Sequence, residues 1–230
     1  MSKQTLLFRG PIKTRSGYGA HSRDLLQALY EMDLFDIKID SCGWGVTPLT
    51  ALDNTNPFHK WIEENIITAL SETPDIYVQV TVPNEFQRIG KYNIGITAGI
   101  ETTVCAPQWV EGCNRMSLNL VSSEHAKKVF QDSRFEKRNS QTQQVEGVIQ
   151  LTSPVEVLFE GADINIYKKL DTLSENDLTK TLDAIPEKFA FLFVGHWLQG
   201  ALGEDRKNVG MMIKTFLETF KNVKDKPALI

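Results

Sequence analysis

Few cysteines occur in this sequence, and none stand at a spacing that would hold a metal or close a loop. The three are Cys42, Cys105 and Cys113, an odd number without a Cys-x-x-Cys pair. The sequence therefore predicts neither a disulfide framework nor a zinc site, and we expect reduced, mostly buried thiols of a cytoplasmic protein. The four histidines are scattered without the spacing of metal ligands, so no metal site is predicted.

An excess of one charge and a long apolar run are also missing. Lys and Arg together number 25 against 29 Asp and Glu, which gives a net charge of −4 without long runs of one sign. Such a surface has no general affinity for nucleic acid or for anionic membranes. No apolar run approaches the ~18 residues of a membrane span, and the N-terminal residues lack a signal-peptide pattern. We expect neither a nucleic-acid partner nor a membrane span.

Three catalytic motifs are absent as well, and each absence counts against a class of enzyme. Without G-x-x-x-x-G-K-[ST], a P-loop nucleotide hydrolase is excluded. Without G-x-S-x-G, an α/β-hydrolase is disfavoured, because that turn carries the nucleophile of such enzymes. The pair Asp-x-Asp, which binds the metal in single-domain, metal-dependent sugar transferases, is missing too.

What the sequence does contain is an alternation of strand and helix patterns. Its 230 residues correspond to roughly one and a half domains. Apolar runs predict strands at 6–9, 35–42, 75–82, 92–100, 118–121 and 155–159. Helical spacing and an N-cap at Ser123 predict helices at 25–32, at 58–70 and from 124 onward, and the polar stretch 136–153 is a loop or a hairpin. The predicted fold class is therefore α/β, a Rossmann-like doubly wound parallel sheet covered on both faces.

A second Rossmann-like unit is predicted to begin near residue 186. A helix at 174–185 ends before Pro186, and an apolar strand follows at 189–194. A glycine-containing loop at 195–205 leads into an amphipathic helix, and 227–230 opens another strand. The apolar face of that helix consists of Val209, Met212, Ile213, Phe216, Leu217 and Phe220. We therefore expect a domain at 1–185 and an incomplete second domain at 186–230 in a truncated chain.

The first strand-to-helix loop carries glycines that suit an anion site. Gly17 and Gly19 open a helix, where bare backbone N–H groups point toward a bound anion. The dinucleotide pattern G-x-G-x-x-G has its third glycine replaced by Ser22 here, although Asp40 lies near the distance at which that pattern has an acidic residue. Simple turn chemistry and a nicotinamide-dependent oxidoreductase both remain alternatives at this point.

A second candidate anion site follows the strand at 189–194. Arg206 and Lys207 are predicted to lie in the first turn of the helix, where cations oppose the helix dipole. Two adjacent cations suit that position if they share it with a bound anion. The alternative is a solvated pair balanced by Glu204 and Asp205.

Two further residues lie where ligands bind in open α/β sheets. Glu101 follows the carboxyl end of a buried strand, where its carboxylate would act as a base or orient a sugar hydroxyl, or else cap the next turn. Trp44 lies in a glycine-rich loop and would stack on a sugar face or fill part of the core.

Together these segments resemble the glycosyltransferases of the GT-B fold, in the large retaining family of glycogen- and sucrose-synthase-like enzymes, of the kind found in phages and marine bacteria. The resemblance is carried by 15–21, 82–86, 99–103, Trp109, 113–114, 122–124, 160–163, 193–195 and 205–208. It implies an N-terminal Rossmann-like domain for the acceptor and a C-terminal one for a nucleotide-sugar, which is a co-substrate and not a cofactor.

The resemblance also implies the roles of individual residues. The donor diphosphate is assigned to Gly17, Gly19, Arg206 and Lys207. The acceptor side is assigned to Tyr18, Trp44 and Thr102. Glu101 takes the catalytic position at which many relatives have a histidine, and no metal is needed if Arg206, Lys207 and a helix end supply the positive charge.

One departure from the family limits what this chain does alone. The Glu-x7-Glu segment that grips the donor sugar in the family is absent. We therefore expect a sugar transferase in a truncated or split form that is inactive alone, with a partner chain or oligomer completing the second domain. A non-catalytic binding or assembly module and an NAD-dependent oxidoreductase remain the alternatives.

Overall fold

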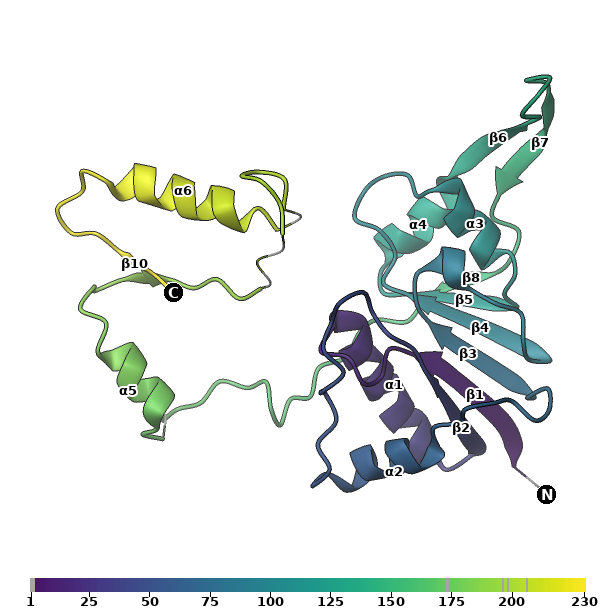
Figure 1. Cartoon of the computed structure of the whole chain (residues 1–230), viewed down its shortest axis with the longest axis horizontal. Helices are drawn as coiled ribbons and strands as arrows, with labels where there is room; N and C mark the ends of the chain where they lie inside the picture. The colour runs from purple at the N-terminus through teal and green to yellow at the C-terminus, as the bar shows by residue number, and fades with distance from the viewer. Residues whose placement is uncertain (1–2, 173, 196, 198, 206) are drawn as a thin grey trace. The chain divides into compact units, whose positions relative to one another are not determined.

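A computed structural model shows strands and helices alternating along most of the chain (Figure 1). It describes residues 3–172, 174–195, 197, 199–205 and 207–230. Contacts within the chain divide it into two units, Met1–Ala162 and Asp163–Ile230. The domain boundary predicted from the sequence lies between residues 185 and 186, because the helix near residue 180 was assigned to the first domain. In the structure this helix lies in the second unit.

Unit 1 contains most of the regular structure. In chain order its elements are β1 (Gln4–Gly10), α1 (Gly17–Met32), β2 (Phe35–Ser41), α2 (Pro57–Asn65), β3 (Ile76–Val80), the 3₁₀ turn η1 (Pro83–Glu85), β4 (Tyr92–Thr97), α3 (Pro107–Cys113), β5 (Leu118–Val121), α4 (Glu124–Asp132), β6 (Arg134–Arg138), β7 (Val145–Gln150) and β8 (Val155–Val157).

The central sheet of unit 1 has six strands in the order β2-β1-β3-β4-β5-β8, and every neighbouring pair is parallel. Just after α2, Ile66 forms one further parallel bridge to Ile39 at the outer edge of β2. This bridge stands where a third strand would lie, so the first six positions of the sheet follow the Rossmann order 3-2-1-4-5-6, with the third strand reduced to a single contact. β8 adds a seventh position beyond β5. The predicted α/β, Rossmann-like parallel sheet is confirmed.

The same bridge explains why α2 is shorter than the predicted 58–70. Ile66 has an extended backbone, with φ −69° and ψ 127°, because it pairs with β2 and leaves the helix. The hydrophobic periodicity of the sequence cannot predict this pairing, because Ile66 and Ile67 also fit the apolar stripe of a helix.

Helices cover both faces of the sheet, as a doubly wound fold requires. Alternate side chains of a strand point to opposite faces, and in β1 Phe8 packs with Leu26 of α1 and Ile62 of α2. Leu7 belongs to the other core cluster, which contains residues of α3 and α4 such as Phe130. The chain leaves β1 toward β2 and returns to β3 on the opposite side, so the carboxyl ends of β1 and β3 flank the switch point where such sheets bind ligands.

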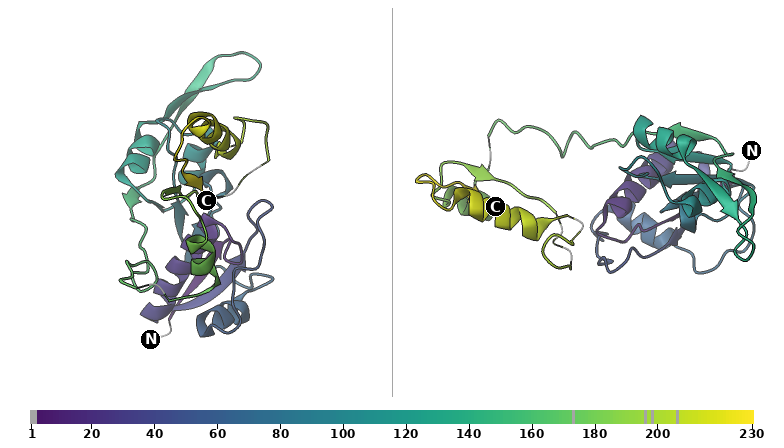
Figure 2. Two further views of the ribbon diagram at one scale, coloured as in Figure 1. Left: turned by 90° about the vertical axis from the view of Figure 1, so that its left-hand side faces the viewer. Right: turned by 90° about the horizontal axis from the view of Figure 1, so that it is seen from above.

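The predicted loop or hairpin at 136–153 is a hairpin. β6 and β7 pair antiparallel in a two-stranded sheet of their own. The hairpin projects away from the central sheet of unit 1, as the left-hand view of Figure 2 shows.

Unit 2 is a small strand-helix-strand unit preceded by a helix. Its elements are α5 (Asp177–Asp183), β9 (Ala190–Phe191), α6 (Val209–Phe220) and β10 (Ala228–Leu229). β10 pairs parallel to β9, so the strand expected at 227–230 is present, whereas β9 is much shorter than the predicted 189–194. α5 begins later than the predicted residue 174 because Asn176 and Thr179 form a reciprocal capping box at its N-terminus.

Candidate functional site

The loop between β1 and α1 is held by its own hydrogen bonds. Ser16 caps α1, and its Oγ accepts a hydrogen bond from the Gly19 amide at 3.0 Å. Thr14 Oγ1 donates to the carbonyl of Pro11 at 2.7 Å, and Arg23 Nη1 donates to the carbonyl of Thr14 at 3.0 Å. The backbone at the start of α1 is therefore fixed before any ligand arrives.

The two glycines of this loop have different surroundings. A Cβ on Gly17 would meet nothing within 4 Å, and Gly17 is exposed at the first turn of α1. A Cβ on Gly19 would lie 2.4 Å from the carbonyl oxygen of Thr14, so glycine is needed there for close packing. Gly17 is open to an approaching anion, while the Gly19 amide is already engaged by Ser16.

Ser22 occupies the position at which the dinucleotide pattern has its third glycine. That glycine allows close packing of helix and strand in such folds. Here a Cβ on Gly10 would lie 2.7 Å from Ser22 Oγ, so the small residue is Gly10 on the strand and the serine fits opposite it. Ser22 is buried, and its Oγ donates to the carbonyl of Tyr18 at 2.7 Å. The departure at Ser22 is thus compensated within the fold.

Asp40, which kept the oxidoreductase alternative open, is paired with another side chain. Arg9 on the neighbouring strand donates a hydrogen bond to its carboxylate. The two residues stand opposite each other in the register of β1 and β2. In a dinucleotide site the corresponding carboxylate binds ribose hydroxyls, and here the guanidinium of Arg9 occupies it.

Tyr18 connects the first turn of α1 to the end of β4. Its hydroxyl lies 2.9 Å from Thr97 Oγ1 and accepts a hydrogen bond from the Ala98 amide at 3.2 Å. Burial raises the pKa of the Tyr18 hydroxyl, and the nearby charges of Glu160 and Glu101 raise it further. Three segments distant in the sequence therefore surround this phenol at the carboxyl edge of the sheet.

Trp44 stacks directly on Tyr18. The ring centroids are 4.2 Å apart and the planes are inclined by 24°. Trp44 is half-buried in the loop that follows β2, and this loop is tied to the β1–α1 loop by hydrogen bonds from Arg15 N to Pro48 O and from Ala51 N to Lys13 O, both 3.1 Å. The loop tryptophan therefore neither fills the core completely nor stands free in solvent.

The loop after β4 carries Glu101 and Thr102. Gly99 turns it with φ +82°, and a Cβ there would lie 2.5 Å from Ala126 Cβ on α4. Thr102 Oγ1 donates to the carbonyl of Val104 at 2.9 Å, and the Thr102 carbonyl lies 3.2 Å from His125 Nε2. Glu101 is exposed, and its charge acts on the Tyr18 hydroxyl. The predicted catalytic residue Glu101 thus lies at the same edge of unit 1 as the predicted acceptor-side residues, which are Tyr18, Trp44 and Thr102.

In unit 2 the predicted position of the basic pair needs correction. α6 begins at Val209, so Lys207 lies in the turn before the helix and not in its first turn. The buried Asp205 carboxylate accepts hydrogen bonds from the amides of Val209 at 3.1 Å and Lys207 at 3.2 Å, and so holds the turn that leads to the N-cap residue Asn208. The alternative of a solvated pair balanced by Glu204 and Asp205 stays a prediction, although the Asp205 carboxylate is buried and bonded to backbone amides. Arg206 lies outside the described residues.

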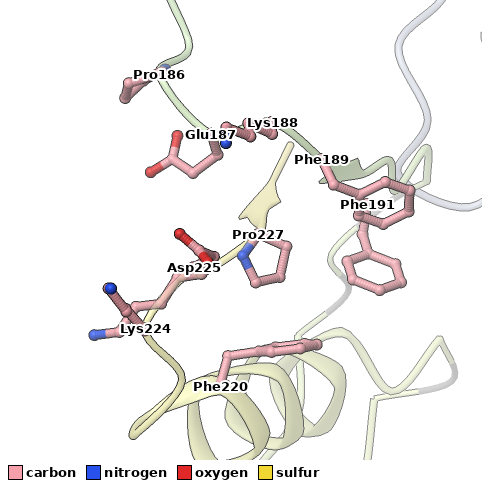
Figure 3. A pocket seen from close by; sticks show the side chains of 10 residues that line it. Pro186, Glu187, Lys188, Phe189, Phe191, Phe220, Lys224, Asp225 and Pro227 are labelled. Atoms are coloured by element: carbon pink, nitrogen blue, oxygen red, sulfur yellow. The ribbon is translucent and has the colours of Figure 1, made fainter.

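A hollow of about 580 Å³ lies elsewhere in unit 2 (Figure 3). Phe189, Phe191 and Phe220 form one wall, and Lys188 and Lys224 stand on the rim. Its lining includes residues that precede β9 and β10, so it lies toward the amino ends of these strands. Ligands of open α/β sheets bind at the opposite, carboxyl edge, where Lys207 follows β9. The hollow is therefore not the predicted diphosphate site.

Two residues of the unit 1 site were not predicted as site residues from the sequence. Thr97 ends β4 and holds the Tyr18 hydroxyl, and Glu160 follows β8 and raises the pKa of Tyr18. A polar residue at the carboxyl end of a buried strand was the available signal for Thr97. Nothing in the sequence alone indicates that Glu160 and Tyr18 are neighbours.

Within the part of the chain that the structure describes, no group of three or more His, Cys, Asp or Glu side chains is arranged to hold a metal ion. Over the same residues, no helix combines the length and the apolar character needed to cross a membrane. Comparison of the chain with protein-family models, with curated proteins and with solved structures found no match.

Proposed function

We propose that this chain belongs to a metal-independent glycosyltransferase of the GT-B type, which moves a sugar from a nucleotide-sugar to an acceptor. Unit 1 is the acceptor side, and unit 2 belongs to the nucleotide-sugar side. The observation that carries the proposal is the cluster around Tyr18. Trp44 stacks on its ring, and the loop of Glu101 and Thr102 is tied to its hydroxyl through Ala98.

The chemistry required of such an enzyme matches the groups available. Breaking the bond between sugar and diphosphate leaves negative charge on the departing nucleotide, and preorganised N–H groups and cations stabilise that charge. In the proposal the open amide of Gly17 at the start of α1 supplies this stabilisation in unit 1. Arg206 and Lys207 keep the donor-diphosphate role that the sequence predicts for them in unit 2. Gly19 serves by letting α1 pack closely against its loop.

Glu101 is the proposed catalytic residue. Its exposed carboxylate accepts or orients the proton of an acceptor hydroxyl, which makes the oxygen a better nucleophile. Trp44 and Tyr18 offer an aromatic surface of the kind on which the apolar face of a sugar ring packs. Thr102 lies next to Glu101 on the same loop.

The oxidoreductase alternative is less well supported. In NAD sites a carboxylate at the end of the second strand binds the ribose, and here Asp40 is paired with Arg9. The third glycine of the dinucleotide pattern is replaced by Ser22, whose buried hydroxyl fills the space next to Gly10. The close packing of helix and strand at this position therefore does not favour a dinucleotide site.

Thermal shift and saturation-transfer NMR with a panel of nucleotide-sugars and with NAD test this proposal. We expect stabilisation by at least one nucleotide-sugar and none by NAD. Lys207→Ala should weaken the binding of a nucleoside diphosphate, and Lys214→Ala on the exposed face of α6 is the matched control that should not. Stabilisation by NAD alone would overturn the assignment, as would equal diphosphate affinity of Lys207→Ala and the parent chain.

A further inference from the structure

The β6–β7 hairpin extends beyond what the fold of unit 1 requires. α4 already provides the connection between β5 and β8, and the hairpin follows it as an additional element. At its base Phe135 and Ile149 pack against the core. Farther out its polar groups bind one another, as in the hydrogen bond of 2.7 Å from Asn139 Nδ2 to Glu146 Oε1. The outer part of the hairpin projects from the unit (Figure 2).

A bulge in this hairpin brings two valines to one face. Lys137 stands opposite Gly147, but the next residue, Arg138, stands opposite Val145, so β7 has one extra residue there. In a regular strand Val145 and Val148 would point to opposite faces, because they are three positions apart. The bulge places both on the same face.

This face, which we call the outer face, consists of Glu136, Arg138, Val145 and Val148. Glu136 stands opposite Val148, and Arg138 opposite Val145. Val145 is 51% exposed and Val148 60% exposed, and more than half of each charged side chain is also exposed. The outer face therefore has an apolar row along β7 and a row of one acid and one base along β6.

We propose that the outer face is a self-association surface whose partner is a second copy of this chain. A two-fold axis in the plane of contact, perpendicular to the strands and midway between the two residue pairs, lays β6 on β6 and β7 on β7. Glu136 of each copy then faces Arg138 of the other, and Val148 of each faces Val145 of the other. The same four residues thus satisfy both sides of the contact.

The composition of the face favours a second copy over other partners. Glu136 and Arg138 form an ion pair with each other within the chain, and Arg138 Nε donates to Glu136 Oε2 at 3.0 Å. The two-fold contact lays this pair antiparallel to the same pair of the second copy, so that opposite charges also face each other between the copies. A nucleic-acid surface needs an excess of cations, and a membrane surface needs a larger apolar area. The area of one hairpin is small compared with the ~1,200 Å² or more of stable interfaces, so the dimer should be weak and concentration-dependent.

Sedimentation velocity of the full chain over a range of concentrations tests this proposal. The parent chain should shift from monomer to dimer as its concentration rises. Glu136→Arg sets arginine against Arg138 within the chain and in both symmetric contacts, and Arg138→Glu sets glutamate against Glu136 in the same way. Each exchange should raise the dissociation constant about tenfold or more, because like charges then face each other. The double exchange Glu136→Arg/Arg138→Glu restores opposite charges and should restore the dimer.

Lys137→Glu is the control on the opposite face of the same strand, and its dissociation constant should equal that of the parent. Circular dichroism checks that each variant is folded. A parent chain that stays monomeric throughout overturns the proposal. Association that the single exchanges leave unchanged, or that the double exchange fails to restore, overturns it too. Nucleotide-sugar binding plays no part in this test, so the outcome is independent of the proposed enzymatic function.

Discussion

The hydroxyl of Tyr18 lies 2.9 Å from the hydroxyl of Thr97, although 79 residues separate them in the sequence. Tyr18 comes from the first turn of α1, and Thr97 ends β4, two strands away from β1 in the sheet. This contact crosses the carboxyl end of β3 and links the two loops that the proposed function needs most.

Tyr18→Phe removes the hydroxyl and keeps the ring that stacks on Trp44. Loss of the contacts with Thr97 and the Ala98 amide should lower the free energy of unfolding by about 1–2 kcal/mol. Urea denaturation measures the change. Tyr30→Phe is the control, since Tyr30 is 42% exposed, and its effect should stay within about 0.5 kcal/mol. Equal effects of the two variants would show that the Tyr18 hydroxyl does not link the loops.

Alanine at the two glycines of the first loop should have opposite consequences. Gly19→Ala puts a Cβ 2.4 Å from the Thr14 carbonyl and should destabilise the fold by about 2 kcal/mol or more. Gly17→Ala meets nothing within 4 Å and should leave stability unchanged or slightly raised, because alanine favours the helix. Thermal unfolding of both variants provides the measurement, and a Gly17→Ala variant less stable than Gly19→Ala would contradict the packing described here.

Acid should weaken unit 1 partly through Asp75. Lys91 Nζ donates to its carboxylate at 2.7 Å and the Thr5 amide at 3.0 Å, and these bonds lower the pKa of Asp75 from 3.8 to about 2. A carboxyl whose pKa is lower in the folded state stabilises the fold above its unfolded pKa, and this contribution disappears as pH falls through the folded pKa. Between pH 4 and pH 2 the parent should therefore lose more thermal stability than Asp75→Asn. Parallel losses in the two proteins would refute the role of Asp75.

The cysteines should react in an order set by burial. Burial raises the pKa of the Cys113 thiol to about 12 and also raises the pKa values of Cys105 and Cys42. A raised pKa leaves little thiolate near pH 8, and the thiolate is the reactive form. Iodoacetamide labelling followed by mass spectrometry should modify the half-buried Cys42 slowly and the other two only after unfolding. Rapid labelling of Cys113 in the folded protein would contradict its buried position.

Much of unit 1 follows from local patterns, and the exceptions have identifiable causes. Strands such as β3 and β5 were predictable because they are short, mostly apolar runs without an exposed residue. The end of α2 was not, because a single long-range bridge from Ile66 to Ile39 decides it. In the turn before α6, a buried carboxylate at Asp205 displaced the predicted helix start, which charge patterns alone do not reveal.

In the candidate site, too, the residues could be predicted from local sequence, whereas their contacts with distant segments could not. Gly17, Tyr18 and Glu101 were singled out by their positions next to strand ends and by a family resemblance. The sequence could not tell that Gly19 is needed for packing, since that depends on how closely its helix approaches the Thr14 carbonyl. It also left the surroundings of Trp44 open, because its stacking partner Tyr18 lies 26 residues earlier on another loop.

The most direct test of the account is an NMR titration of the isotope-labelled full chain with a panel of nucleotide-sugars and with NAD. The account predicts that a nucleotide-sugar shifts the backbone amides of Gly17 and Tyr18, and that adding a sugar acceptor shifts the Trp44 indole and the amides of 98–103. Shifts at these positions with NAD alone, or no shifts there with any nucleotide-sugar, would contradict the assignment of sugar transfer to this edge of the sheet.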